Sequence, residues 1–255
     1  MGKIIAISNH KGGIGKTTTA VTLASAAGHF RKRALLVDLD PQAQCAVSLG
    51  VSRSPGLYAV VWEGEPLAEH IIQARPNCDL LAGTRDSTAR LQDEMVGDPL
   101  GVWRLAETLE DEARQYDVVL LDCPPTLGRL NVAALIAADG VLIPTQCNYL
   151  GMESVGQFLN ELRQARPRRG APRTEVMGII PTFFDQRTNA SREAYQILLD
   201  DFGDLVARPI PKATAVERVA EEGKSMWEAC PHSPATLTYG RLAEWLYTVG
   251  LREDL

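Results

Sequence analysis

Short apolar runs alternate along this chain with longer segments of helical periodicity. Several of the runs are apolar at consecutive positions, which is typical of strands that are covered on both faces. The segments between them are long enough for crossover helices. The predicted strands are 3–8, 33–40, 78–83, 117–125, 140–146, 175–184 and 205–211. The predicted helices are 17–28, 100–115, 128–138, 152–165 and 189–201.

This alternation predicts a doubly wound α/β fold, in which a mainly parallel sheet has helices on both faces. No repeat, low-complexity segment or linker divides the chain, so we expect one domain over residues 1–255. The basic stretch "RPRRGAPR" (166–173) is interpreted as an exposed loop of that domain. Ligands of such folds bind beyond the carboxyl ends of the strands, so we expect the chemistry in the segments that follow them.

Charge, cysteine content and hydropathy limit what the protein can bind and where in the cell it is expected. The 255 residues include 26 Lys and Arg against 32 Asp and Glu, which gives a formal net charge of −6. Nucleic-acid binding would therefore require a local basic patch. Five cysteines without C-x-x-C spacing, and the lack of a signal-peptide core, predict reduced thiols in the cytoplasm. No apolar run approaches the roughly 18 residues that a membrane span needs.

The segment "HKGGIGKTT" (10–18) follows a predicted strand and opens a predicted helix. Its glycines allow backbone N–H groups to turn around phosphate oxygens, and the helix N-terminus adds partial positive charge. Lys16 is expected to reach the β- and γ-phosphates, and the Thr17 hydroxyl to ligate Mg²⁺. His10 stands where the usual G-x-x-x-x-G-K-[ST] pattern has its first glycine. The expected nucleotide contacts in this loop are Lys11, Gly12, Gly13, Ile14, Gly15, Lys16, Thr17 and Thr18.

The stretch "KGGIGKTT" matches in full the deviant Walker A motif of the ParA/MinD family of ATPases, and the resemblance runs to about residue 225. It is closest to the ParA/Soj branch, which partitions chromosomes and plasmids. The resemblance implies a P-loop NTPase fold that binds ATP and Mg²⁺ and hydrolyses ATP to ADP and phosphate. No N-terminal helix-turn-helix is expected, because the loop begins at residue 11. Further similar segments are "LLVDLDPQ" (35–42), "VVLLDCPPTLG" (118–128), "PTQCNYLGMESVGQFL" (144–159) and "FFDQRTNAS" (183–191).

The loop contains two lysines, although a phosphate cradle needs one. The resemblance implies that Lys11 reaches across a dimer interface to the phosphates of ATP held by the other subunit, much as an arginine finger does. Two such cationic surfaces repel each other until ATP lies between them, so the homodimer is expected to depend on ATP. The alternative is that Lys11 is a solvated loop cation.

Carboxylates follow two of the predicted strands. Asp38 and Asp40 lie two positions apart at the end of one predicted strand, and we expect the two carboxylates to have different roles. The resemblance implies that Asp40 orients or activates the attacking water, that Asp38 lies near the magnesium shell, and that Asp122 is the Walker B ligand. Each could instead cap a following helix. Pro124 and Pro125 stiffen the next segment, either to sense the γ-phosphate or as a simple turn. The expected metal-binding residues are Thr17, Asp38 and Asp122, and the expected catalytic residues are Lys11, Lys16 and Asp40.

The segment "PIPKAT" (209–214) resembles the loop that holds adenine in this family. Pro211 and Lys212 match the pattern, whereas Ala213 replaces the usual asparagine. Pro211 and Ala213 are therefore expected to contact the base, Ala213 through its backbone.

Members of the ParA/Soj branch bind DNA without sequence preference, and Arg187 matches a family DNA-contact arginine. A second such arginine aligns with Ala215, a departure for which nearby cations could compensate. The stretch 163–173 is expected at the edge away from ATP, which favours a solvated loop there. The expected DNA-binding residues are Arg187, Arg192, Lys212 and Arg218.

The resemblance also implies a ParB-like partner that accelerates hydrolysis, a cytoplasmic, nucleoid-associated location, and a role in segregating a chromosome or plasmid. Membrane docking is not expected, because the last residues are acidic, and no second cysteine pairs with Cys123 in the pattern of an iron–sulfur relative. The alternatives are a ParA-like ATPase that positions a protein cargo, a metabolic P-loop enzyme such as an ATP-dependent amidoligase, and a binding module without useful turnover.

Overall fold

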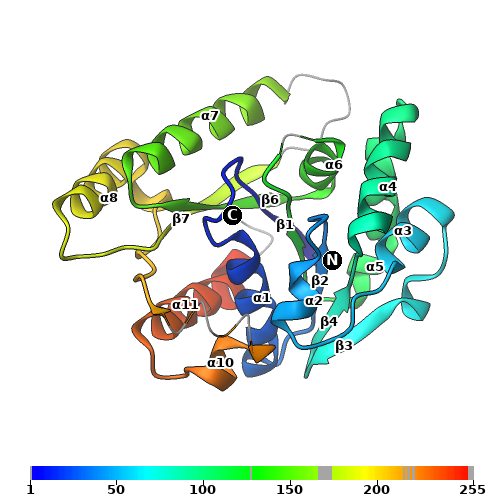
Figure 1. Cartoon of the computed structure of the whole chain (residues 1–255), viewed down its shortest axis with the longest axis horizontal. Helices are drawn as coiled ribbons and strands as arrows, with labels where there is room; N and C mark the ends of the chain where they lie inside the picture. Colours follow the sequence, from blue (N-terminus) through cyan, green and yellow to red (C-terminus); the bar gives the residue numbers. More distant parts are fainter. Residues whose placement is uncertain are drawn as a thin grey trace.

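A seven-stranded sheet organises the part of the chain that the computed structural model describes (Figure 1). The strand order is β3-β4-β2-β5-β1-β6-β7, and every neighbouring pair is parallel except β3 and β4. The described residues are 2–126, 128–165, 174–214, 216, 219 and 222–251. The strands are β1 (Lys3–Ile7), β2 (Ala34–Asp38), β3 (Ile71–Arg75), β4 (Cys78–Leu81), β5 (Val118–Asp122), β6 (Gly140–Gln146) and β7 (Glu175–Thr182).

Helices lie between the strands, and α8, α10 and α11 follow the last strand. The longer ones are α1 (Lys16–Ala26), α4 (Arg85–Gly97), α5 (Arg104–Glu112), α6 (Arg129–Ala137), α7 (Tyr149–Ala165), α8 (Asn189–Phe202) and α11 (Pro234–Trp245). The short ones are α2 (Gln44–Ser48), α3 (Gly56–Tyr58) and α10 (Met226–Ala229). Single 3-10 or π turns are η1 (Ala27–Phe30), η2 (Ala59–Glu63), η3 (Leu67–Glu69), η4 (Gly101–Trp103), η5 (Ala113–Gln115), η6 (Gly203–Leu205) and η7 (Leu246–Gly250).

Two hydrophobic cores lie on opposite faces of the sheet. Helices α3 to α8 pack on one face, and α1, α2, α10 and α11 pack on the other (Figure 1). Along β5, Val119 and Leu121 enter the first core, whereas Val118 and Leu120 enter the second. All four side chains are fully buried. Side chains alternate faces along a strand, so a strand covered on both faces is apolar at consecutive positions. The predicted doubly wound α/β fold is thereby confirmed.

Strand β3 was not among the predicted strands. It pairs antiparallel with β4 through the two-residue turn Pro76–Asn77, where Asn77 has a positive φ of 60°. Its side chains are only partly buried and include Gln73 and Arg75, because β3 lies at the sheet edge. A half-exposed strand of mixed polarity lacks the continuous apolar run that marked the central strands.

The prediction of a strand over 205–211 was wrong. This segment runs beside β7 but makes only two isolated bridges, between Ile179 and Val206 and between Phe184 and Pro211. Pro209 and Pro211 have no backbone N–H to donate, so a continuous ladder cannot form.

The carboxyl ends of the central strands meet at one edge of the sheet. Asp122 at the end of β5 is paired in register with Ile7 of β1 on one side and with Asp38 of β2 on the other. The loop after β1 and both carboxylates are therefore adjacent, as the parallel arrangement requires.

No helix in the described ranges is both long and apolar enough to cross a membrane. The C-terminal helix α11 and the turn after it pack against α1. The Tyr239 hydroxyl lies 2.9 Å from the Thr19 hydroxyl, and the Tyr247 hydroxyl donates to the Leu23 carbonyl at 2.8 Å.

Candidate active site

The loop between β1 and α1 is preformed around the start of the helix. Gly13 and Gly15 have positive φ values of 68° and 90°, a conformation that side chains with a Cβ rarely adopt. Gly15 is the N-cap of α1, and no side chain caps the helix there. The first backbone N–H groups of α1 therefore have no intrahelical partner, and they suit an anion such as phosphate.

The ends of β6 and β7 hold this loop in place. The Thr182 hydroxyl lies 2.9 Å from the Ile14 carbonyl oxygen and 3.0 Å from that of Thr145. The Gln146 amide donates to the Gly13 carbonyl at 3.3 Å. The side chain of Ile14 is buried, so it anchors the loop by packing, while its backbone stays near the helix start.

His10, the departure from the usual phosphate-loop pattern, faces α7. Its Nε2 lies 3.0 Å from Glu161 Oε2, and its ring meets Phe158 edge-on with the ring centres 5.1 Å apart. Burial lowers the pKa of His10, against the opposing charge of Glu161. This side chain therefore attaches the loop to α7.

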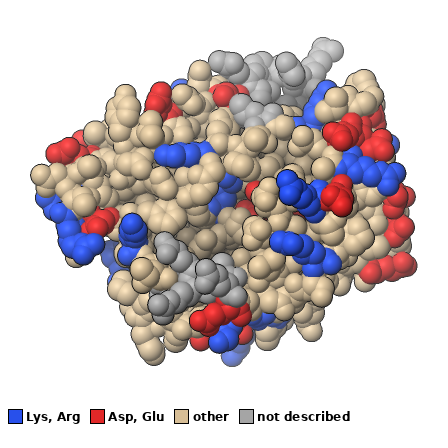
Figure 2. Space-filling model, viewed as in Figure 1, with Lys and Arg blue, Asp and Glu red and all other residues tan. Residues whose placement is uncertain are grey.

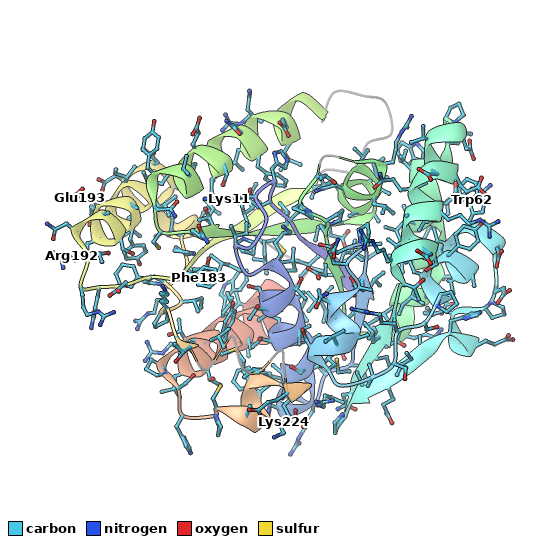
Figure 3. The ribbon with its side chains drawn as sticks, viewed as in Figure 1. Lys11, Trp62, Phe183, Arg192, Glu193 and Lys224 are labelled. Carbon is cyan, nitrogen blue, oxygen red and sulfur yellow. The ribbon has the colours of Figure 1, made fainter. Side chains whose placement is uncertain are left out.

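The two loop lysines have different surroundings. The Lys16 side chain is 6% exposed, and its ammonium donates to the Lys11 carbonyl at 3.0 Å. Burial lowers the pKa of Lys16, while the Asp122 charge opposes that shift. Lys11 is partly exposed, and its ammonium forms no hydrogen bond or ion pair within the described ranges (Figure 3).

Asp38 and Asp122 form a buried carboxylate pair next to the loop. Both are inaccessible to solvent. Asp38 accepts backbone N–H groups from Asp40 at 3.2 Å and from Cys45 at 3.0 Å, one on each carboxylate oxygen. Burial and mutual repulsion raise the pKa of Asp38, and burial raises that of Asp122.

Asp122 has the free oxygen that a magnesium ion requires. Its Oδ2 accepts from the Cys45 thiol at 3.3 Å, whereas its Oδ1 is buried without a hydrogen-bond partner. The nearby Thr17 hydroxyl lowers the pKa of Asp122. A hydroxyl and a carboxylate beside a phosphate cradle are the hard oxygen donors that Mg²⁺ prefers. Ligand atoms of Asp38, Cys45 and Asp122 lie within 4.8 Å of one another, but both Asp38 oxygens already hold backbone N–H groups.

Asp40 lies beyond the end of β2, in the turn that follows the strand. One of its oxygens accepts the Gln42 backbone N–H at 2.9 Å, and its carbonyl accepts that of Ala43 at 2.8 Å. The carboxylate is partly exposed, and its charge acts on both Lys16 and Asp122. Asp40 is therefore accessible to solvent beside the expected phosphate position.

Asn131 of α6 was not recognised from the sequence. This buried amide donates to the carbonyls of Pro124 at 3.3 Å and Thr126 at 3.4 Å, and it accepts the Ser8 hydroxyl at 3.1 Å. It therefore joins the segment after β5 to the start of the phosphate loop. A lone asparagine in an otherwise apolar helix was the available signal, because buried amides need polar partners.

The expected base loop is bonded to the segment after β7. The Phe184 N–H donates to the Ile210 carbonyl at 3.0 Å, and the Lys212 N–H donates to the Phe184 carbonyl at 2.9 Å. Pro211 lies in this ladder at the carboxyl edge of the sheet, and the partly buried Ala213, two residues later, packs against the second core.

Phe183 precedes that ladder with a left-handed backbone, φ 52° (Figure 3). This is uncommon for a bulky residue. A Cβ added at Gly15 would lie 3.9 Å from the Phe183 ring, so this residue touches the phosphate loop as well.

Three of the four expected DNA-binding residues are described. The Arg187 side chain is 84% exposed and pairs with Asp185. Arg192 bonds to the Gln186 carbonyl at 2.7 Å and to Asn189 Oδ1 at 2.5 Å. Lys212 is exposed. Figure 2 shows basic side chains at the left edge of the view, over the region between β7 and α8 in Figure 1. Arg218 and Ala215 lie outside the described residues, as does 166–173 of the basic stretch.

Comparisons with known proteins identify the family of this chain. A family profile described as "AAA domain" matches residues 2–171. A protein named "Chromosome-partitioning ATPase Soj" from Thermus thermophilus is 39% identical over 241 residues, which cover 94% of this chain and 93% of the relative.

Two solved structures show similar folds. McdA from Cyanothece has a TM-score of 0.86 at 23% identity, over 96% of this chain and 100% of that one. The structure named cobyrinic acid a,c-diamide synthase, from Mycobacterium smegmatis with bound ADP and magnesium, has a TM-score of 0.81 at 28% identity. The match covers 98% of this chain and 97% of that one. The profile covers more than half of the chain and the Soj relative nearly all of it. The chain therefore belongs to the ParA/MinD family of deviant Walker A ATPases, of the ParA/Soj type, and its cofactors are ATP and Mg²⁺.

Proposed function

We propose that this ATPase is a dimerising switch that holds DNA without sequence preference when ATP is bound and that partitions a chromosome or plasmid. The partitioning role is carried over from the name of the Soj relative. The observation that carries the dimer is the contrast between the two loop lysines. Lys16 is buried and its ammonium donates a hydrogen bond to the Lys11 carbonyl, whereas the Lys11 ammonium has no partner in the described part of the chain. The Lys11 side chain is therefore available to the nucleotide of a second subunit.

Each residue of the site has a role in this proposal. The backbone N–H groups of residues 12–18 bind the phosphates, and the Lys16 ammonium exchanges the Lys11 carbonyl for a phosphate oxygen. Thr17 and Asp122 hold Mg²⁺, which neutralises phosphate charge when it is bound. Asp40 orients the attacking water with the oxygen that its own turn leaves unused. Asp38 fixes the turn that carries Asp40, through the two N–H groups that it accepts.

DNA binding is proposed for the surface of Arg187, Arg192 and Lys212. Phosphate contacts by these side chains carry no sequence information, so the binding does not depend on DNA sequence. For each phosphate neutralised, the logarithm of the binding constant falls by about 0.9 for every tenfold rise in salt concentration. The backbone ladder between Phe184 and residues 210–212 links this surface to the base loop. Dimerisation brings two such surfaces together.

The remaining parts of the proposal concern partner and location. A ParB-like protein accelerates hydrolysis, and the ATPase works in the cytoplasm on the nucleoid. Burial of Tyr239, Leu242 and Leu246 in the second core supports the absence of membrane docking, because these apolar side chains of α11 and the turn after it pack inside the protein.

A second candidate is an ATP-dependent amidoligase. The name of the Mycobacterium smegmatis structure favours it, at 28% identity over nearly the whole chain. In that case the same phosphate loop would serve phosphoryl transfer to a small acid, and ATP turnover would require that acid.

The test is retention on an arbitrary duplex with ATP, with ADP and without nucleotide, with sedimentation velocity under the same three conditions. We expect dimers and salt-sensitive DNA retention with ATP alone. An ATP-loaded protein that stays monomeric at every concentration contradicts the switch. Turnover that starts only on addition of an acid and an ammonia donor, without retention on DNA, favours the amidoligase.

A further inference from the structure

The proposed DNA surface contains a carboxylate. Asp185 lies in the segment between β7 and α8, two residues before Arg187. Its Oδ1 accepts Arg187 Nε at 2.9 Å and the Arg187 backbone N–H at 3.0 Å, and its Oδ2 accepts the second guanidinium nitrogen at 2.8 Å. This is the two-pronged geometry in which an arginine also binds a phosphate group.

The charge of a second cation of the same surface also acts on this carboxylate. The Lys212 backbone N–H donates to the Phe184 carbonyl at 2.9 Å, which brings Lys212 beside the next residue, Asp185. The guanidinium of Arg187 and, to a smaller extent, the charge of Lys212 hold the pKa of Asp185 well below its usual range. Asp185 therefore remains ionised under physiological conditions.

Arg192 provides an internal comparison. Its guanidinium bonds to the neutral oxygens of Gln186 and Asn189, so its charge is not compensated by these contacts. Of the three described cations proposed to contact DNA, Arg187 is thus paired with Asp185, the charge of Lys212 acts on the same carboxylate, and Arg192 bonds to neutral oxygens.

We propose that Asp185 is an internal counterion that competes with DNA phosphates for Arg187 and Lys212 and keeps the affinity of a single subunit for DNA low. This inference rests on the proposed DNA binding. A phosphate must displace the carboxylate from the guanidinium fork, and the remaining negative charge repels the polyanion. A surface weakened in this way retains DNA only when two copies act together, because linked sites multiply their affinities. Asp185 thereby makes retention depend more strongly on dimerisation.

The test is Asp185→Asn. The asparagine keeps an oxygen for the Arg187 backbone N–H but removes the charge. With one more cation available, the slope of log affinity against log salt should steepen by about 0.9. If the two proteins have equal affinity near 1 M salt, that slope corresponds to about eightfold tighter binding at 0.1 M. We also expect measurable retention of the variant without nucleotide.

Glu193→Gln is the matched control. Glu193 is an exposed carboxylate on α8, and no arginine among the described residues hydrogen-bonds to it (Figure 3). This variant removes the same charge from the same part of the molecule, so it reports the general electrostatic effect, which we expect to be clearly smaller.

The outcomes separate the two proposals. If wild type retains DNA with ATP but Asp185→Asn binds no tighter than Glu193→Gln, the counterion role is overturned and DNA binding stands. Weaker binding by a folded Asp185→Asn also overturns it, since the carboxylate would then orient Arg187 toward phosphate. If the asparagine variant does not fold, Asp185→Ser is compared with Glu193→Gln in its place, because the serine hydroxyl can accept the same Arg187 N–H. Loss of retention by wild type and both variants at low salt overturns both proposals.

Discussion

The Lys16 ammonium lies 3.0 Å from the carbonyl oxygen of Lys11, so the first lysine of the loop offers its backbone to its own subunit and leaves its side chain free. A carbonyl that can accept the Lys16 ammonium is present whatever side chain stands at position 11. Substitution of Lys11 should therefore separate nucleotide binding from dimerisation.

Lys11→Ala is expected to bind ATP as a monomer and to lose ATP-dependent dimers. Each charge-assisted hydrogen bond contributes about 1.5–3 kcal/mol, and the symmetry of a dimer removes two. The dimer dissociation constant should then rise by about 10²- to 10⁴-fold. Sedimentation velocity with ATP measures this change, with Lys224→Ala, an exposed lysine paired with Glu222, as the control. Normal dimers of Lys11→Ala would remove this lysine from the interface.

Asp40→Ala is expected to abolish hydrolysis while leaving ATP binding intact. The carboxylate does not take part in the phosphate loop, and loss of a group that orients or activates water typically lowers turnover by about 10²- to 10⁴-fold. Phosphate release under single-turnover conditions checks the rate, and equilibrium dialysis checks the affinity. Unchanged turnover would assign water activation to another residue.

Asn131→Ala is expected to lower the free energy of unfolding by about 1–3 kcal/mol, because it leaves buried polar partners without their hydrogen bonds. Those partners include Ser8 and the carbonyls of Pro124 and Thr126. Urea denaturation measures the change. Val132→Ala, at a partly exposed position of the same helix, is the control. Equal losses in the two variants would mean that the network contributes little.

Arg187→Glu is expected to weaken DNA retention and to leave ATP-dependent dimers unchanged. The reversal places a second negative charge next to Asp185, so phosphate is repelled from this surface. Binding to a labelled duplex across a salt series measures the effect, and Arg85→Glu, at the exposed start of α4, applies the same charge change elsewhere. Retention equal to wild type would exclude Arg187 from the DNA surface.

Much of the fold was predictable because the central strands are buried on both faces. Such strands are apolar at consecutive positions, as at 4–7 of β1, 34–37 of β2, 118–121 of β5 and 141–143 of β6. The edge strand β3 is only partly buried and escaped notice. The opposite error occurred at 205–211, where an apolar segment extends beside β7 but its prolines prevent a ladder.

The candidate site also contains some residues that the sequence predicted and others that it did not. Lys16 and Thr17 could be predicted as site residues because a phosphate loop requires these residue types at a fixed spacing. Asn131 and Thr182 contact the site from elements that are distant in sequence, and their partners depend on which strand ends meet. A sequence does not show that Thr182, 168 residues after Ile14, is within hydrogen-bond distance of its carbonyl.

The ladder between Phe184 and residues 210–212 has a practical consequence for following this ATPase in solution. Four of its five cysteines are buried, and Cys230 is only partly exposed. After Cys230→Ser, a thiol introduced by Glu193→Cys would be the only accessible labelling site. An environment-sensitive fluorophore there sits on the helix that follows this ladder, and so would report nucleotide exchange in real time without touching the nucleotide pocket.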